Sequence, residues 1–122
     1  GAYAWRKLID AGAIIANGSD FPVESPNPFF GLHAAITRQD HGNQPPGGWF
    51  PEERMTAAEA YASFTLDAAY AGHQENTIGS LESGKAADFI LVDQDVFGNA
   101  PTEIWKATVS GTWVNGVRVG AD

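Results

Sequence analysis

Residues 8–18 read LIDAGAIIANG, in which a helix end is followed at once by a short apolar run. The spacing of apolar residues over 4–11 predicts a helix that ends at Gly12, a residue typical of helix C-termini. Residues 13–16 are continuously apolar and are bounded by Asn17 and Gly18. This pattern predicts a strand that is buried on both faces. Helix, tight turn and buried strand together form one αβ step of an α/β fold.

Two further helices are predicted downstream. One begins near Pro28, since proline is well tolerated in the first turn of a helix. The other begins at Thr56, whose spacing to Glu59 forms a capping box, and its apolar stripe continues to Gly72. Between these helices, residues 42–51 are rich in glycine and proline and form an irregular loop. An irregular loop of this length is uncommon unless it has a function, such as covering a binding site.

The pattern changes to β after Gly79. Residues 86–92 contain the run FILV, and residues 108–119 hold two short alternating segments around Asn115 and Gly116. An Asn-Gly pair between alternating segments is the strongest short-range signal of a hairpin. We therefore divide the chain into an α/β part, residues 1–77, and a small β part, residues 78–122.

Composition excludes several classes of protein. The chain has 122 residues, which suits one domain, and a formal net charge of −8. It has no cluster of Lys and Arg, so we expect no nucleic-acid partner and no membrane partner. Cysteine is absent, which excludes disulfides, thiolate zinc sites and cysteine nucleophiles. The start lacks a signal segment and a methionine, so we expect a fragment or processed product, with a cytoplasmic location favoured.

Asp20 is the strongest candidate for chemistry. It lies just past the carboxyl end of the predicted strand over residues 13–16, the edge at which α/β folds place their active sites. A carboxylate there can bind a metal and take a proton from metal-bound water. The alternative is structural, since Asp in a Gly-Ser-Asp turn often accepts hydrogen bonds from its own backbone. The residues alone leave both interpretations open.

The three histidines have plainer alternatives, and their spacing contains no HxH or HExxH pair. His33 lies on a predicted helix face, where a hydrogen-bonded core histidine is commoner than a ligand. His41 lies in a loop and is either solvated or substrate-facing. His73 follows a helix-ending glycine, and the field at a helix C-terminus explains it.

Three further residues have two interpretations each. Glu24 is either a substrate-facing residue or a solvated loop carboxylate. Trp49 and Phe50 lie between prolines and form either a lid over a pocket or a plug in the core. Sequence spacing does not separate these alternatives.

Two stretches resemble the amidohydrolase superfamily. Residues 79–93, GSLESGKAADFILVD, are similar to its C-terminal segment GSLEPGKxADxVVLD, with Ser83 in place of the usual proline. Residues 17–24, NGSDFPVE, are similar to its last barrel strand, where GSD supplies the final catalytic aspartate. With Asn27 and Pro28, the match points to the amidohydrolase family 3 branch, which includes predicted metal-dependent hydrolases and exoenzyme regulatory proteins.

The resemblance implies an α/β fold that is the C-terminal fragment of a (β/α)8 barrel plus part of a small accessory β-sandwich. Residues 1–77 would hold the last strand and flanking helices, and residues 78–122 the sandwich strands; a whole barrel needs about 250 residues. It also implies that Asp20 is the catalytic residue and a ligand of a divalent metal, zinc, in the full-length protein. We expect the chain alone to bind no catalytic zinc tightly, because such sites need about three protein ligands.

The implied function is the C-terminal portion of a metal-dependent amidohydrolase that hydrolyses C–N bonds of a small molecule, incomplete by itself. The alternative is a non-catalytic structural or regulatory module that retains the scaffold. The sequence upstream of this chain distinguishes the two: an HxH and two later histidines would indicate the enzyme, and their absence the module. A parallel barrel strand needs neighbours on both edges. We therefore expect the fragment to self-associate into a homo-oligomer through residues 13–16, or to rearrange that strand within the chain.

Overall fold

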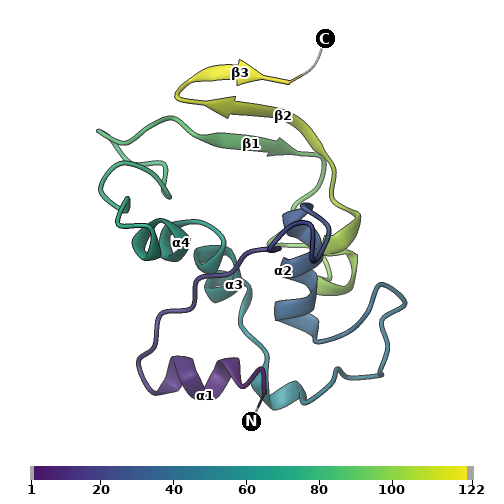
Figure 1. Ribbon diagram of the computed structural model, residues 1–122. Coiled ribbons are helices and arrows are strands. Elements are labelled where there is room, and N and C mark those ends of the chain that lie inside the picture. The colour runs from purple at the N-terminus through teal and green to yellow at the C-terminus, as the bar shows by residue number, and fades with distance from the viewer. Residues whose placement is uncertain (1, 121–122) are drawn as a thin grey trace.

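The computed structural model describes residues 2–120, with most helices before the strands. The helices are α1 (Trp5–Asp10), α2 (Pro28–Thr37), the 3-10 helix η1 (Pro51–Glu53), α3 (Ala57–Ser63), α4 (Leu66–Ala71) and the 3-10 helix η2 (Pro101–Lys106). The strands are β1 (Phe89–Val92), β2 (Val109–Val114) and β3 (Val117–Val119). Figure 1 shows the sheet and α1 at opposite ends of the molecule, with the other α-helices between them.

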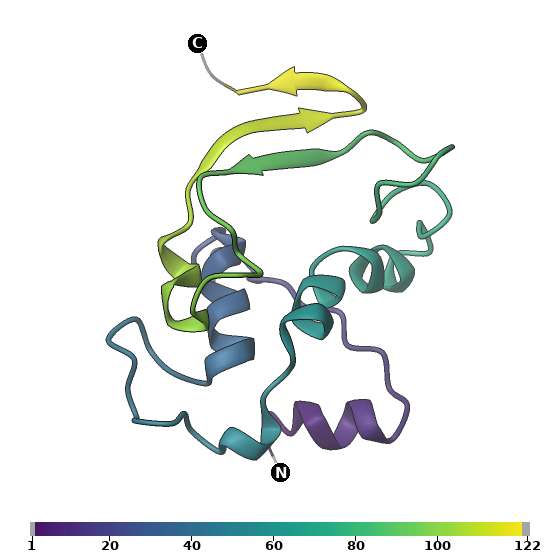
Figure 2. The same cartoon turned by 180° about the vertical axis from the view of Figure 1, so that it is seen from behind.

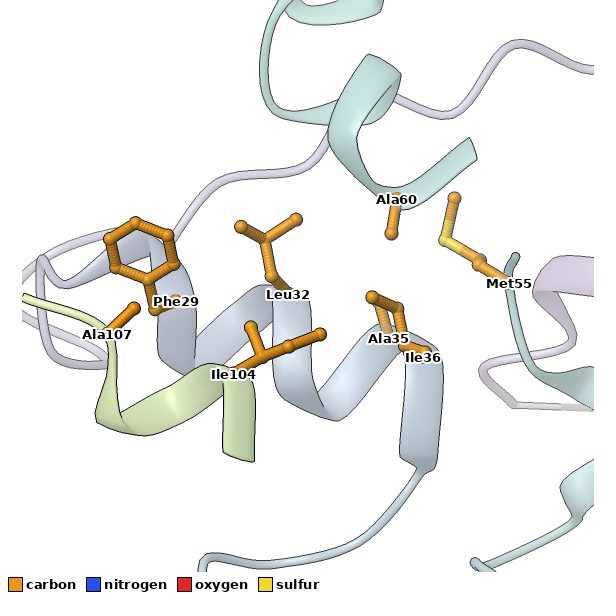
Figure 3. Close-up of a cluster of buried hydrophobic side chains, with 8 residues drawn as sticks. All are labelled: Phe29, Leu32, Ala35, Ile36, Met55, Ala60, Ile104 and Ala107. Atoms are coloured by element: carbon orange, nitrogen blue, oxygen red, sulfur yellow. The ribbon is translucent and has the colours of Figure 1, made fainter. Parts of the chain in front are cut away.

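The core forms around α2, which begins and is buried as its sequence predicts. Pro28 occupies the first turn, and the Asn27 side chain caps the helix by accepting a hydrogen bond of 3.0 Å from the Phe29 N–H. The helix packs against α3 and against η2 from the far end of the chain. Figure 3 shows the buried apolar cluster that results, which consists of Phe29, Leu32, Ala35, Ile36, Met55, Ala60, Ile104 and Ala107.

The helix predicted from Thr56 to Gly72 is two helices. The capping box forms as predicted, with the Glu59 N–H and the Thr56 N–H each bonded to the other residue's side chain. The uninterrupted helix is wrong, because Thr65 leaves helical geometry at φ −129° and ψ −93°. The Thr65 hydroxyl donates a hydrogen bond of 2.7 Å to the Tyr61 carbonyl, and such bonds to the preceding turn bend helices.

The β region matches its sequence signals. The three strands form one antiparallel sheet in the order β1-β2-β3. Asn115 and Gly116 connect β2 to β3 with φ of 51° and 76°, the left-handed pair that a tight type I′ hairpin requires. Figure 2 shows the three strands running side by side, with β1 and β3 at the two edges.

The strand predicted over residues 13–16 is not formed. The segment is extended, but its flanking backbone bonds join Ala13 to Leu8 and Asn17 to Ser63, and no strand pairs with it within residues 2–120. Ile14 is 55% exposed, so the expected burial on both faces is wrong as well. The physical reason is the lack of a partner strand for this segment. The three strands that the described residues form pair with one another, and their sheet lies away from residues 13–16 (Figure 1).

The division of the chain at residue 77 stays a prediction. Residues 101–107 follow that boundary, yet Ile104 and Ala107 belong to the same buried cluster as α2. Among the described residues, none of the helices has both the length and the apolar character that crossing a membrane requires.

Candidate functional site

Asp20 lies in a compact turn between the extended segment and α2. The Ser19 carbonyl accepts a hydrogen bond of 3.2 Å from the Glu24 N–H, and the Asp20 carbonyl accepts one of 2.9 Å from the Val23 N–H. Asp20 itself has a φ of 50°, a left-handed conformation that Asp tolerates better than most residues. The turn therefore presents Asp20 on an exposed loop just past residues 13–16, although the strand predicted there is not formed.

The Asp20 carboxylate accepts no hydrogen bond from any described residue. In the structural interpretation, the Asp20 side chain would accept a hydrogen bond within its own turn. The Ser19 hydroxyl oxygen takes that role instead, accepting a hydrogen bond of 3.3 Å from the Phe21 N–H. A Cβ added at Gly18 would lie 3.7 Å from the Asp20 Oδ1, so the carboxylate folds back over that glycine. This side chain is consequently available to an external partner.

The donor set fits one position in a metal's coordination sphere. A free carboxylate is a suitable ligand for zinc and other divalent ions. Residues 2–120 contain no group of three or more His, Cys, Asp or Glu side chains arranged to hold an ion. Asp20 can therefore supply one ligand, and the described residues do not supply the rest of a site.

A groove of about 760 Å³ lies beside this turn and gathers three of the other candidates. Its walls come from the Asp20-bearing loop, from α2 and from residues 39–42. Glu24, His33 and His41 all line it, whereas Asp20 and His73 do not. The groove thus joins residues that the sequence separates, and it places Glu24 on the same side of the loop as the two imidazoles.

His33 is the buried core histidine that its helix position indicates. Its side chain is fully buried, with Nε2 lying 3.3 Å from the Asn43 Oδ1 and with no hydrogen-bond partner at Nδ1 among the described residues. Burial lowers the pKa of His33 below its ordinary value, and the bond to Asn43 offsets only part of that effect. Burial therefore favours the neutral form of the ring within the fold.

His41 is exposed, as its loop position indicates, but its ring is not free of contacts. Its ring stacks on Trp105 at a centroid distance of 4.6 Å and an interplanar angle of 2°, and it meets the edge of Phe30 at 4.4 Å. Sequence reasoning missed Trp105, which lies in η2, because no local pattern links it to the loop after α2. The stack fixes one wall of the groove.

The remaining candidates lie elsewhere. His73 has a φ of 56° directly after α4, where its N–H bonds to the Tyr70 carbonyl at 2.9 Å. Trp49 and Phe50 are 47% and 54% exposed, so they do not plug the core. Trp49 instead packs on the Arg38 guanidinium, whose carbon lies 4.9 Å from the ring centroid.

The architecture matches a solved hydrolase structure. The crystal structure of an amidohydrolase from Thermotoga maritima MSB8 superimposes with a TM-score of 0.70 over 98% of this chain and 26% of that chain, at 22% sequence identity. At that identity, the superposition shows a shared fold alone. The sequence profile of the Amidohydrolase family matches residues 1–119, so this chain belongs to the Amidohydrolase family, as the two motifs predicted.

Several curated relatives support this membership. Over 97% of its own length, this chain is 31% identical to the Arabidopsis thaliana protein LONG AFTER FAR-RED 3, and over 94% it is 30% identical to the Bacillus subtilis protein YtcJ. It is 31% identical to the N-substituted formamide deformylase of Arthrobacter pascens over 92% of its length. The chain spans 20%, 22% and 20% of these three relatives, about a fifth of each.

Proposed function

We propose that this chain is the C-terminal portion of a metal-dependent amidohydrolase that hydrolyses C–N bonds of a small molecule. The observation that carries the proposal is the exposed Asp20 carboxylate, which accepts no hydrogen bond from residues 2–120 and lies in the family's GSD motif. Two relatives, the formamide deformylase and an imidazolonepropionase of Bdellovibrio bacteriovorus, bear names of hydrolytic enzymes and support a C–N substrate.

Asp20 would hold a divalent metal, zinc, and act as a base in the complete enzyme. When bound, the metal supplies an activated water at neutral pH. The role of the chain is to hold the carboxylate at the end of the segment 13–16 and to leave both of its oxygens unpaired. The remaining ligands would come from residues outside this chain, which by itself would be inactive.

The finer fold proposal is that the chain completes a (β/α)8 barrel and an accessory β-sandwich. Residues 13–16 would be the last barrel strand, paired on both edges in the complete protein. The sheet offers a second unpaired surface, because the strand register puts Ile90, Val114, Val117 and Val119 on one face and all four are exposed. Residues 1–77 and 78–122 would then contribute to the two parts.

The groove beside Asp20 would contact the small-molecule substrate. It is lined by the Glu24 carboxylate and by the rings of Phe30 and His41, so it can combine polar and aromatic contacts. Its volume of about 760 Å³ is in the range of small-molecule sites. No nucleic-acid or membrane partner is proposed, since the chain has a net charge of −8.

The test is substitution of Asp20 in the complete protein, with an N-substituted formamide as the probe. Asp20→Asn keeps the size of the side chain but removes the negative ligand and the base. We expect the rate of hydrolysis to fall by roughly 10²–10⁴-fold while the protein stays folded. Asp10→Asn is the matched control, because Asp10 is an exposed carboxylate of α1 that pairs with Arg6 at 3.4 Å and should not affect hydrolysis.

Two results would contradict the proposal. Near-normal hydrolysis by the Asp20→Asn variant would make Asp20 a turn residue. A complete protein without an HxH and two later histidines upstream would favour the non-catalytic module that keeps the amidohydrolase scaffold.

A further inference from the structure

The loop that carries Asp20 touches the rest of the molecule through very few polar contacts. From Gly18 to Pro26, the hydrogen bonds formed by the described residues stay within the loop itself, as in the Ser19–Phe21 and Ser19–Glu24 bonds, apart from one of 3.3 Å that the Asn27 N–H donates to the Ser25 Oγ. The loop is next tied down at Asn27, which caps α2. On the other side, the last anchor before Asp20 is Asn17.

Asn17 is bound unusually well for a residue in an extended segment. Its backbone N–H donates to the Ser63 carbonyl at 2.9 Å, and its side-chain Nδ2 donates to the Ser63 Oγ, also at 2.9 Å. The same Nδ2 lies 3.8 Å from the Met55 sulfur, a weak acceptor. Asn17 is therefore held by α3 and by Met55, the residue before the N-cap of α3.

Ser63 is a rigid partner for this clamp. It is fully buried, and its hydroxyl donates a hydrogen bond of 2.7 Å to the Ala60 carbonyl. That donation turns the oxygen lone pairs toward the Asn17 amide. Ala60 is itself fully buried in the core, so the position of the Ser63 hydroxyl is fixed by the packing of α3.

We propose that Asn17 and Ser63 are positioning residues for Asp20. The inference rests on the proposed function, since it takes Asp20 as the metal-binding carboxylate. A ligand on a loop keeps its geometry only if neighbouring hydrogen bonds hold that loop, and loss of such support weakens metal binding or activity by about 10- to 100-fold. The clamp is the contact by which the rigid α3 holds the chain three residues before the carboxylate.

The test compares Asn17→Ala with Asn99→Ala in two measurements. Asn99 is an exposed asparagine whose side chain donates one hydrogen bond, of 3.1 Å, to Gln94, so it is a matched control. In the 122-residue chain, amide exchange at Val23 and Glu24 should accelerate in the Asn17 variant while exchange in α2 stays unchanged. In the complete enzyme, kcat should fall by roughly 10- to 100-fold, a larger change than any rise in KM from loosening Glu24.

A second variant keeps the proposal falsifiable if Asn17→Ala folds poorly. Ser63→Ala removes the other partner of the same bond, so it should reproduce the loop exchange and the kcat loss, and the double variant should lose no more than either single one. Equal acceleration of exchange in the loop and in α2 would overturn the inference. So would full kcat in both single variants when Asp20→Asn is inactive, whereas an active Asp20→Asn variant would instead overturn the proposed function.

Discussion

The helix α2 and the segment 13–16 are both apolar in sequence, yet the structure buries the helix and leaves most of the segment exposed, apart from Ile15, which packs against the core. On α2, Phe29 and Leu32 are each 3% exposed, and the helix has partners in α3 and η2. In the segment, Ile14 is 55% exposed and its backbone pairs with no strand among residues 2–120. The two regions carry the same kind of side chain and differ in the packing and pairing partners that this chain provides.

The contrast shows that an apolar segment becomes buried only where a second, matching surface packs against it. A helix satisfies its own backbone hydrogen bonds, so it needs only an apolar neighbour, and η2 supplies that neighbour through Ile104. A strand needs neighbours that also complete its backbone hydrogen bonds. Residues 13–16 have no such neighbour in the described structure, which fits their proposed place as an inner strand of a larger sheet.

The largest expected effect comes from equivalent truncations in the two regions. Ile104→Ala should lower the free energy of unfolding by about 2–5 kcal/mol, since it opens a cavity at a side chain that is 1% exposed. Ile14→Ala should change it by no more than about 0.5 kcal/mol, because the side chain is mostly in solvent. Denaturant unfolding of both variants measures the difference, and similar losses would show that the segment is packed.

A smaller effect concerns the buried histidine of α2, His33. Because burial lowers the pKa of His33 in the folded chain, the unfolded chain takes up a proton first as pH falls below about 6.5. Stability should therefore be full above about pH 7 and decline as the pH falls through about 6.5. Unfolding curves across this range test the decline, and His33→Gln, which cannot take up the proton, should flatten it. A wild-type profile without slope there would contradict a neutral His33.

The smallest expected effect is weak self-association through the exposed segment. Residues 13–16 carry no charge and leave backbone groups unpaired, so two copies can pair them edge to edge. Sedimentation at several concentrations should show association that Ile14→Lys weakens. Leu81→Lys is the control, since Leu81 is 71% exposed outside the segment. A strict monomer with fast amide exchange at Ile14 and Ile15 would rule the pairing out.

The parts of the fold that sequence predicts well are those encoded by neighbours in the chain. The capping box at Thr56, the start of α2 at Pro28 and the Asn115-Gly116 hairpin each depend on residues within a few positions of one another. Such signals act through local backbone geometry and need no tertiary partner. The break at Thr65 was missed, although its cause is also local, because the apolar stripe continues through it.

The candidate site could be predicted only where a motif covers it, and the role of Asp20 stays a prediction. Asp20 followed from its place after an apolar run and from the family's GSD pattern. The stacking of His41 on Trp105 and the clamp of Asn17 on Ser63 join residues far apart in the chain, and no periodicity reports such pairs. These contacts arise from the packing of α2, α3 and η2, which the sequence patterns do not specify.

The contact between α2 and η2 also sets an order of events during synthesis. Residues 28–37 leave the ribosome well before residues 101–106. The apolar face of α2 therefore lacks its main packing partner, η2, while the intervening chain is synthesised. Non-local contacts of this kind slow folding, because a long loop must close before they form. The nascent chain therefore exposes Phe29 and Leu32 until Ile104 emerges, and this interval is when a chaperone would find its binding surface.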